Sequence, residues 1–141
     1  MKTILAILAA VFAVSASAQT YGTTAVVSGG TNNVAATATN SYGTVINATR
    51  RDAIGLQFSF KCSGTTAVTG GDATLVFVKS LDGTTYDTSN TLRFTLAANS
   101  TSTVCLVTNV TLSSAGYLKL STIENTTTNA ITNVSVIYSA K

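Results

Sequence analysis

The side chains best suited to chemistry in this sequence are a few acids and two cysteines. They are Asp52, Asp72, Asp82, Asp87, Glu124, Cys62 and Cys105. Histidine is absent, which removes histidine-ligated metals, histidine general bases and the nucleophiles that a histidine activates. A glycosidase needs two carboxyl groups facing one cleft, and no acid here lies in a motif that indicates such a pair. We therefore expect no catalytic residue, no metal site and no cofactor.

The first 18 residues predict where these side chains operate. Lys2 supplies positive charge, Ile4 to Val14 form an apolar run, and Ala16-Ser17-Ala18 fits a cleavage site after Ala18. These are the three parts of a secretory signal peptide. The apolar run of about 11 residues is shorter than the roughly 20 that span a bilayer. We expect a secreted, extracellular or periplasmic protein that keeps no stable membrane span after cleavage; a cell surface or a virion surface is also compatible with this leader.

Cys62 and Cys105 are predicted to form a disulfide, because two cysteines in an oxidising compartment usually pair. One detail opposes a simple bridge: Cys105 alternates with Val104 and Leu106, which are expected to face the core. Cys105 would then point outward. A β-bulge, a strand buried on both faces or a bridge between two molecules would each resolve this conflict.

The most distinctive motif is the segment SLDGTTYD, which contains Ser80, Asp82, Gly83 and Tyr86. Asp-Gly between two strands favours a tight hairpin, because glycine accepts positive φ and aspartate bonds to its own turn. We expect Tyr86 to pack over this turn. Asp82 and Asp87 could instead share a Ca²⁺ ion, but two carboxylates fall short of a full acidic loop.

Tyrosines near predicted turns offer a second kind of site. Tyr42, Tyr86 and Tyr117 are the candidates for an exposed platform on which a glycan would stack. Sequons also occur, at Asn47, Asn99, Asn109, Asn125 and Asn133. So many sequons arise readily by chance in a chain with 27 threonines and 15 serines, so they are weak support for glycosylation.

Charge is sparse and evenly spread. Only 9% of the 141 residues are charged, and the chain from Gln19 onward carries seven cations and five acids, a net charge of +2. Arg50-Arg51 is the one adjacent basic pair. Nucleic-acid binding needs clustered Lys and Arg, so we expect no nucleic-acid partner.

The elements that must position these residues are β-strands. Leu56 to Cys62 alternate strictly between apolar and polar side chains, whereas Thr74 to Val78 is apolar on both faces and predicts a central strand. Other candidate strands are Ala25–Ser28, Val34–Thr39, Thr44–Ala48, Leu92–Leu96, Val104–Val110, Tyr117–Ile123 and Ile131–Tyr138. Turn signals recur about every 8–12 residues. The prediction is an all-β, antiparallel two-sheet sandwich, Ig-like or jelly-roll-like, with eight or nine short strands over residues 34–141.

Residues 19–33 differ from the rest, since Gly, Thr, Ser and Asn dominate and Ala25-Val26-Val27 is the only apolar patch. We expect a flexible N-terminal arm or an edge strand. Residues 20–30 could alternatively dock on a neighbouring subunit by β-augmentation. The absence of proline and the sparse charge leave strand edges poorly protected, which suits a protein that self-associates.

From about residue 56 to 141 the chain resembles small Thr-rich β-sandwich proteins found in phage virions and secreted surface assemblies. The features that carry this resemblance are LQFSFKC, TLVFVKSLDGTTYD, GYLKLSTIENTT and the final VSVIYSAK. The resemblance implies a structural or adhesive role and transfers no catalytic residue. We expect a non-enzymatic exported subunit or adhesive module that acts through self-association or a surface partner protein. A secreted carbohydrate-binding sandwich is the alternative.

Overall fold

A computed structural model of the chain describes residues 23–27, 32–64, 71–98, 101–112 and 115–140. The predicted signal peptide at 1–18 therefore lies outside the described residues, as do residues 19–22 and 28–31 of the segment 19–33 and the sequon at Asn99. The described residues form strands and no helix, so none of them builds a helix long and apolar enough to cross a membrane.

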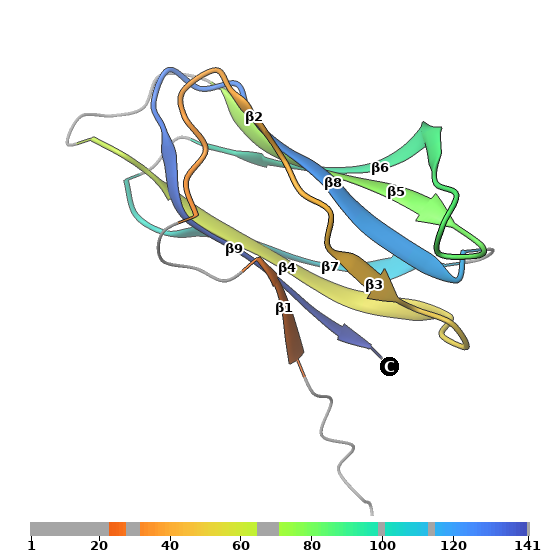
Figure 1. The fold of residues 1–141 in the computed structure, drawn as a ribbon. Helices are drawn as coiled ribbons and strands as arrows, with labels where there is room; N and C mark the ends of the chain where they lie inside the picture. Colours follow the sequence, from red (N-terminus) through yellow and green to blue (C-terminus); the bar gives the residue numbers. More distant parts are fainter. Residues whose placement is uncertain (1–22, 28–31, 65–70, 99–100, 113–114, 141) are drawn as a thin grey trace, which may run out of the picture.

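Nine strands lie within the described residues. They are β1 (Thr23–Val27), β2 (Thr39–Ser41), β3 (Val45–Asn47), β4 (Ala53–Cys62), β5 (Asp72–Ser80), β6 (Asp87–Ala97), β7 (Val104–Thr111), β8 (Tyr117–Asn125) and β9 (Ile131–Ala140). They make two antiparallel sheets packed face to face (Figure 1). The predicted all-β two-sheet sandwich is confirmed.

The strand order separates the two architectures that the sequence left open. One sheet, called sheet A here, has the order β1-β9-β4-β7, and the other, sheet B, has β2-β8-β5-β6 with β3 also paired to β8. The first strand, β1, thus pairs with the last, β9. Strands β2 and β3 both pair with β8, β4 pairs with β7, and β5 pairs with β6. A long hairpin wound on itself gives this nesting, which is the jelly-roll arrangement of two Greek keys.

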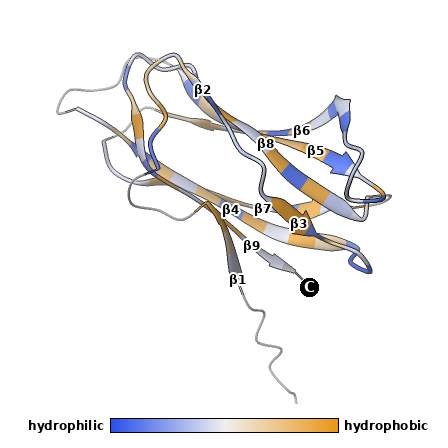
Figure 2. Ribbon diagram, in the orientation of Figure 1, coloured by the Kyte–Doolittle hydropathy of each residue, from blue (hydrophilic) through white to orange (hydrophobic). Residues whose placement is uncertain are grey.

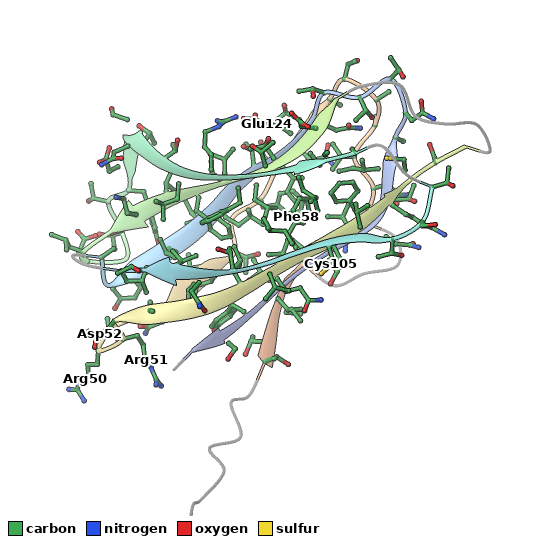
Figure 3. All side chains as sticks on the ribbon, turned by 180° about the vertical axis from the view of Figure 1, so that it is seen from behind. Arg50, Arg51, Asp52, Phe58, Cys105 and Glu124 are labelled. Carbon is green, nitrogen blue, oxygen red and sulfur yellow. The ribbon has the colours of Figure 1, made fainter. Side chains whose placement is uncertain are left out.

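The core lies between the sheets and follows the alternation seen in the sequence. In β4 the side chains of Leu56, Phe58 and Phe60 are buried, while Gln57 and Ser59 between them face outward. Phe58 lies between the two sheets in Figure 3. Figure 2 shows the same alternation as bands of orange and blue along β4 and β8. Period-2 patterning therefore selects which face of each strand is buried.

Strand β5 is buried on both of its faces, as its apolar run predicts. It lies between β8 and β6, so Val76 and Thr74 on the outer face are covered by neighbours rather than by the second sheet. Arg93 of β6 and Glu124 of β8 form an ion pair that crosses β5 on this outer face. The aliphatic part of Arg93 can thereby shield apolar side chains while its head remains in water.

The predicted strand over Val34–Thr39 is wrong in its bounds. Of that range, Val34 pairs in an isolated bridge with Ile131 and Thr39 pairs with Glu124 as the first residue of β2, whereas the residues between them form no strand. The physical reason is Thr37, whose φ of 51° lies in the left-handed region, where a β-branched residue interrupts an extended strand. Asn40 and Ser41, the remaining residues of β2, also pair with β8.

Candidate functional site

The turn between β5 and β6 is fixed by one carboxylate. Asp82 Oδ1 accepts hydrogen bonds of 2.8 Å from the backbone N–H groups of Thr84 and Thr85 and from the Ser80 hydroxyl. The Gly83 N–H donates to Ser80 Oγ at 2.9 Å, and the Tyr86 hydroxyl donates to the Gly83 carbonyl at 3.1 Å. Gly83 has a φ of 76°, which explains why glycine occupies this position.

These bonds favour the ionised form of Asp82. The backbone N–H groups of Thr85 and Thr84, followed by the Ser80 hydroxyl, hold the pKa of this carboxyl well below its usual value. Because the carboxyl is solvent-exposed, the shift comes from hydrogen bonding to the charged form and not from burial. Asp82 therefore carries a negative charge at neutral pH, in a turn that its hydrogen bonds hold together.

The second carboxylate of this hairpin is also engaged by its own backbone. Asp87 Oδ1 accepts the N–H groups of Ser89 at 2.9 Å and Asn90 at 3.1 Å. Within the described residues, no group of three or more His, Cys, Asp or Glu side chains is placed to hold a metal ion. Among the described residues, no third acidic side chain therefore joins Asp82 and Asp87 as a possible calcium ligand.

A hollow of about 530 Å³ opens beside this hairpin. Its lining surface is mainly apolar, although polar and charged residues contribute to it; the lining residues are Lys79, Ser80, Leu81, Asp82, Thr85, Tyr86, Asp87, Asn90 and Ala115. A volume in this range matches small-molecule sites. Leu81 is 78% exposed, which makes it the most exposed large apolar side chain among the described residues.

The structure brings two of the three candidate tyrosines to this end of sheet B. Lys119 Nζ lies 4.0 Å from the centre of the Tyr86 ring, a cation–π contact. The Tyr117 ring lies against Gly83 so closely that an added Cβ would sit 3.2 Å from it. Tyr42 is elsewhere: it packs against the hydrophobic core in the connection between β2 and β3. One ring face of both Tyr86 and Tyr117 is therefore already in contact with protein.

The outer face of sheet A contrasts with the charged hairpin end of sheet B. Its outward side chains are small, neutral or both, with Lys61 as the only charge among those described. They are Thr23, Ala25, Ala53, Gly55, Gln57, Ser59, Lys61, Cys105, Val107, Asn109, Thr111, Thr132, Ser135, Ile137 and Ser139. Val107 is 71% exposed at the margin of this face. This surface, called the neutral face below, is weakly charged.

The predicted Cys62–Cys105 disulfide is wrong as an intrachain bridge. The two residues lie on adjacent strands β4 and β7, but Cys105 pairs with Ser59, which faces outward, whereas Cys62 is buried with Phe58 and Phe60. The two side chains therefore point to opposite faces of one sheet and are not bonded to each other. Cys105 points outward, as its alternation with Val104 and Leu106 indicated.

A buried amide that sequence reasoning did not single out connects three segments. Asn125 is 2% exposed, and its Nδ2 donates to the carbonyls of Asn129 at 2.8 Å and Ala35 at 2.9 Å. Its Oδ1 accepts the Thr127 N–H at 3.0 Å. The side-chain amide of Asn125, which belongs to a sequon, is therefore buried and hydrogen-bonded in the folded protein. The sequon asparagines Asn47, Asn109 and Asn133 are exposed.

The basic pair is also placed by the structure. Arg50, Arg51 and Asp52 are exposed together at the turn that leads into β4 (Figure 3). No protein-family model matches the chain, and no curated protein sequence matches it.

Proposed function

We propose that the chain is an exported, non-enzymatic subunit or adhesive module of an extracellular or virion surface assembly, which acts through surface contacts. The observation that carries this proposal is the neutral face of sheet A. A surface with one charge among its described outward side chains imposes little desolvation cost on a partner, whereas exposed charges must be paired or left in water.

The position of the predicted leader supports export. The first described strand begins at Thr23, beyond the expected cleavage after Ala18. Removing residues 1–18 would therefore leave every described strand intact. A signal peptide must be separable from the fold in this way, because the mature protein has to be stable without it.

The jelly-roll order supports both an assembly role and its alternative. This architecture recurs in viral capsid subunits and in lectins. The fold alone does not choose between them, since unrelated functions are built on the same scaffold. The neutral face favours the assembly role, and the hairpin hollow favours glycan binding.

Export followed by size analysis tests the proposal. The full chain is expressed in a secreting host, and the exported fraction is examined by intact mass and by sedimentation velocity. We expect a mass that begins at Gln19 and species larger than the monomer. An intact leader on folded protein, or a monomer at all concentrations, would contradict the proposal.

A carbohydrate-binding module is the second candidate, because Tyr86 contributes to the hollow and Tyr117 lies next to it. This function predicts a monomer that is retained on immobilised glycans. Tyr86→Ala and Tyr117→Ala should abolish retention while the protein stays folded, and Tyr42→Phe serves as the control because Tyr42 lies outside the hollow. Retention that survives both alanine variants would exclude this hollow as the binding site.

A further inference from the structure

The four edges of the sandwich are not equally protected against pairing with another strand. Strand β1 has five residues and a register shift between Ala25 and Val27, and β2 and β3 have three residues each. Strand β6 carries Asp87 and Arg93 and has an irregular register opposite β5. Short strands, bulges and charges are the usual ways in which proteins block their sheet edges.

Strand β7 has none of these protections. It runs for eight residues in unbroken register with β4, from the pair Ala53–Thr111 to the pair Phe60–Val104. Its sequence, VCLVTNVT, contains no charge and no proline. Within the described part of the chain, β4 is the only strand hydrogen-bonded to it, so β7 ends sheet A with an open edge.

The open edge presents regularly spaced main-chain groups. The Leu112 N–H donates to the Asp52 carbonyl at 2.9 Å, and this pair continues the β4–β7 register by one residue. In an antiparallel ladder, alternate residues bond to the same neighbour. The even-numbered residues of β7 therefore bond to β4, whereas Cys105, Val107 and Asn109 direct their N–H and C=O groups toward the open side.

We propose that β7 pairs antiparallel with β7 of a second copy of this chain, about a two-fold axis at Val107. In this register Val107 faces Val107 of the second copy, and Cys105 faces Asn109. Three such residue pairs exchange about six main-chain hydrogen bonds. The two four-stranded sheets then form one continuous sheet whose outer surface joins the two neutral faces.

Charge and side-chain pairing identify the occupant as a second copy. A two-fold axis places each residue opposite one from the same strand, and an uncharged strand then meets no like charge. The axis at Val107 also covers the 71% exposed valine with its own equivalent. The other edges of this chain are bulged, short or charged and match β7 less well.

The expected contact is weak on its own. Pairing of eight residues buries a few hundred Å² per copy, which is at the low end for specific protein interfaces. Repetition within an assembly strengthens such contacts through effective concentration. The β7–β7 contact would join subunits in the proposed assembly. Only its strengthening by repetition rests on that proposed role.

Cysteine cross-linking tests the register. In Asn109→Cys, the new thiol faces Cys105 of the second copy, so mild oxidation should give a disulfide-linked dimer on non-reducing electrophoresis. Residues 105 and 109 of one strand are about 13 Å apart and cannot bridge within a molecule. Two matched controls, Thr111→Cys and Asn109→Cys combined with Cys105→Ser, should give about tenfold less dimer, because neither places facing thiols in this register.

A charge placed on the β7 edge distinguishes β7–β7 pairing from contact through the neutral face of sheet A. Val107→Lys puts two ammonium groups opposite each other and should return the wild-type dimer to monomer in sedimentation. Ser135→Lys adds the same charge to the same face but two strands from the edge, on β9, and should leave the dimer unchanged.

Three outcomes would overturn the pairing: equal cross-linking in the controls, no cross-link with Asn109→Cys, or a dimer lost only in Ser135→Lys. Larger species that form without the specific cross-link would overturn the pairing and leave the proposed assembly role in place. A chain that stays monomeric would overturn both.

Discussion

At the scale of single residues, the two cysteines show how the direction of a side chain decides its chemistry. Cys62 is 2% exposed in the core, and Cys105 is exposed on the outer face of the neighbouring strand. Reaction with a thiol reagent needs an accessible thiolate, so the two should differ sharply in rate.

We expect one label per molecule in the folded protein, at Cys105, and two labels in denaturant. Mass spectrometry after alkylation without a reductant measures this directly. A Cys105→Ser variant, which should take no label when folded, is the control. An unlabelled wild-type chain even in denaturant would mean that both sulfurs are bonded.

Asp82 should make the stability of the protein depend on pH in the acid range. Its pKa is depressed in the folded state, so the ionised carboxylate stabilises the fold above its unfolded pKa of about 3.9. This contribution is lost as the pH falls below about 4 toward the folded pKa. Asp82→Asn should therefore unfold at a lower temperature than wild type at pH 7, and the gap should narrow between about pH 4 and pH 2. A gap that stays constant over this range would contradict the role given to the charge.

Asn125 should matter more for stability than any exposed asparagine. Asn125→Ala leaves buried carbonyls without their donor and should lower the free energy of unfolding by about 2–4 kcal/mol in urea titration. The exposed Asn109 provides the matched control, since Asn109→Ala should change the free energy of unfolding by less than about 0.5 kcal/mol. Equal effects of the two substitutions would show that the hydrogen bonds of Asn125 are replaceable.

At the scale of secondary-structure elements, β1 belongs to the fold of its own chain. Thr23–Val27 pairs with β9, and Val26 and Val27 are buried in the core. An arm that served only a neighbouring molecule would leave these valines outside its own core.

Deleting Thr23–Val27 should therefore destabilise the monomer by about 3–5 kcal/mol, the cost of exposing two valines and part of the core beneath them. Urea unfolding of a chain that begins at Gln19, with and without Thr23–Val27, measures the difference. Replacing the exposed Thr23 and Thr24 by alanine tests whether the loss comes from the valines. A deletion that leaves stability unchanged and only reduces oligomer size would restore the docking-arm interpretation.

The sequence predicts individual strands better than it predicts which strands pair with one another. Strict alternation in Leu56–Cys62 and the apolar run Thr74–Val78 indicate a one-sided and a two-sided buried strand, because burial acts on each strand locally. Which strands lie side by side depends on long-range pairing, so the approach of Tyr117 to Gly83 is not readable from spacing. The disulfide prediction failed for a different reason: the redox compartment was given more weight than the outward direction that local alternation already indicated for Cys105.

At the scale of the whole molecule, the charges are distributed unequally between the two sheets. The Arg93–Glu124 ion pair, Lys119 and the hairpin acids belong to sheet B, whereas the neutral face of sheet A carries only Lys61 among its described outward side chains. A contact made through sheet A should thus be governed by main-chain bonds and apolar burial.

Association should accordingly be insensitive to salt. Raising NaCl from about 0.1 M to 1 M shortens the Debye length from about 10 Å to 3 Å, which weakens interactions between exposed charges. Sedimentation velocity across this range should give the same distribution of species. Dissociation at high salt would instead assign the contact to the charged sheet.

The place of β9 in sheet A also has a consequence for how the chain is made. Ile131–Ala140, the last strand in sequence, lies between β1 and β4 (Figure 1), so it joins the beginning of the chain to its middle. Sheet A cannot close until β9 is available to pair, because pairing over such sequence distances waits for the distant partner. During synthesis, β1 and β4 therefore remain without the strand that joins them until β9 has been made.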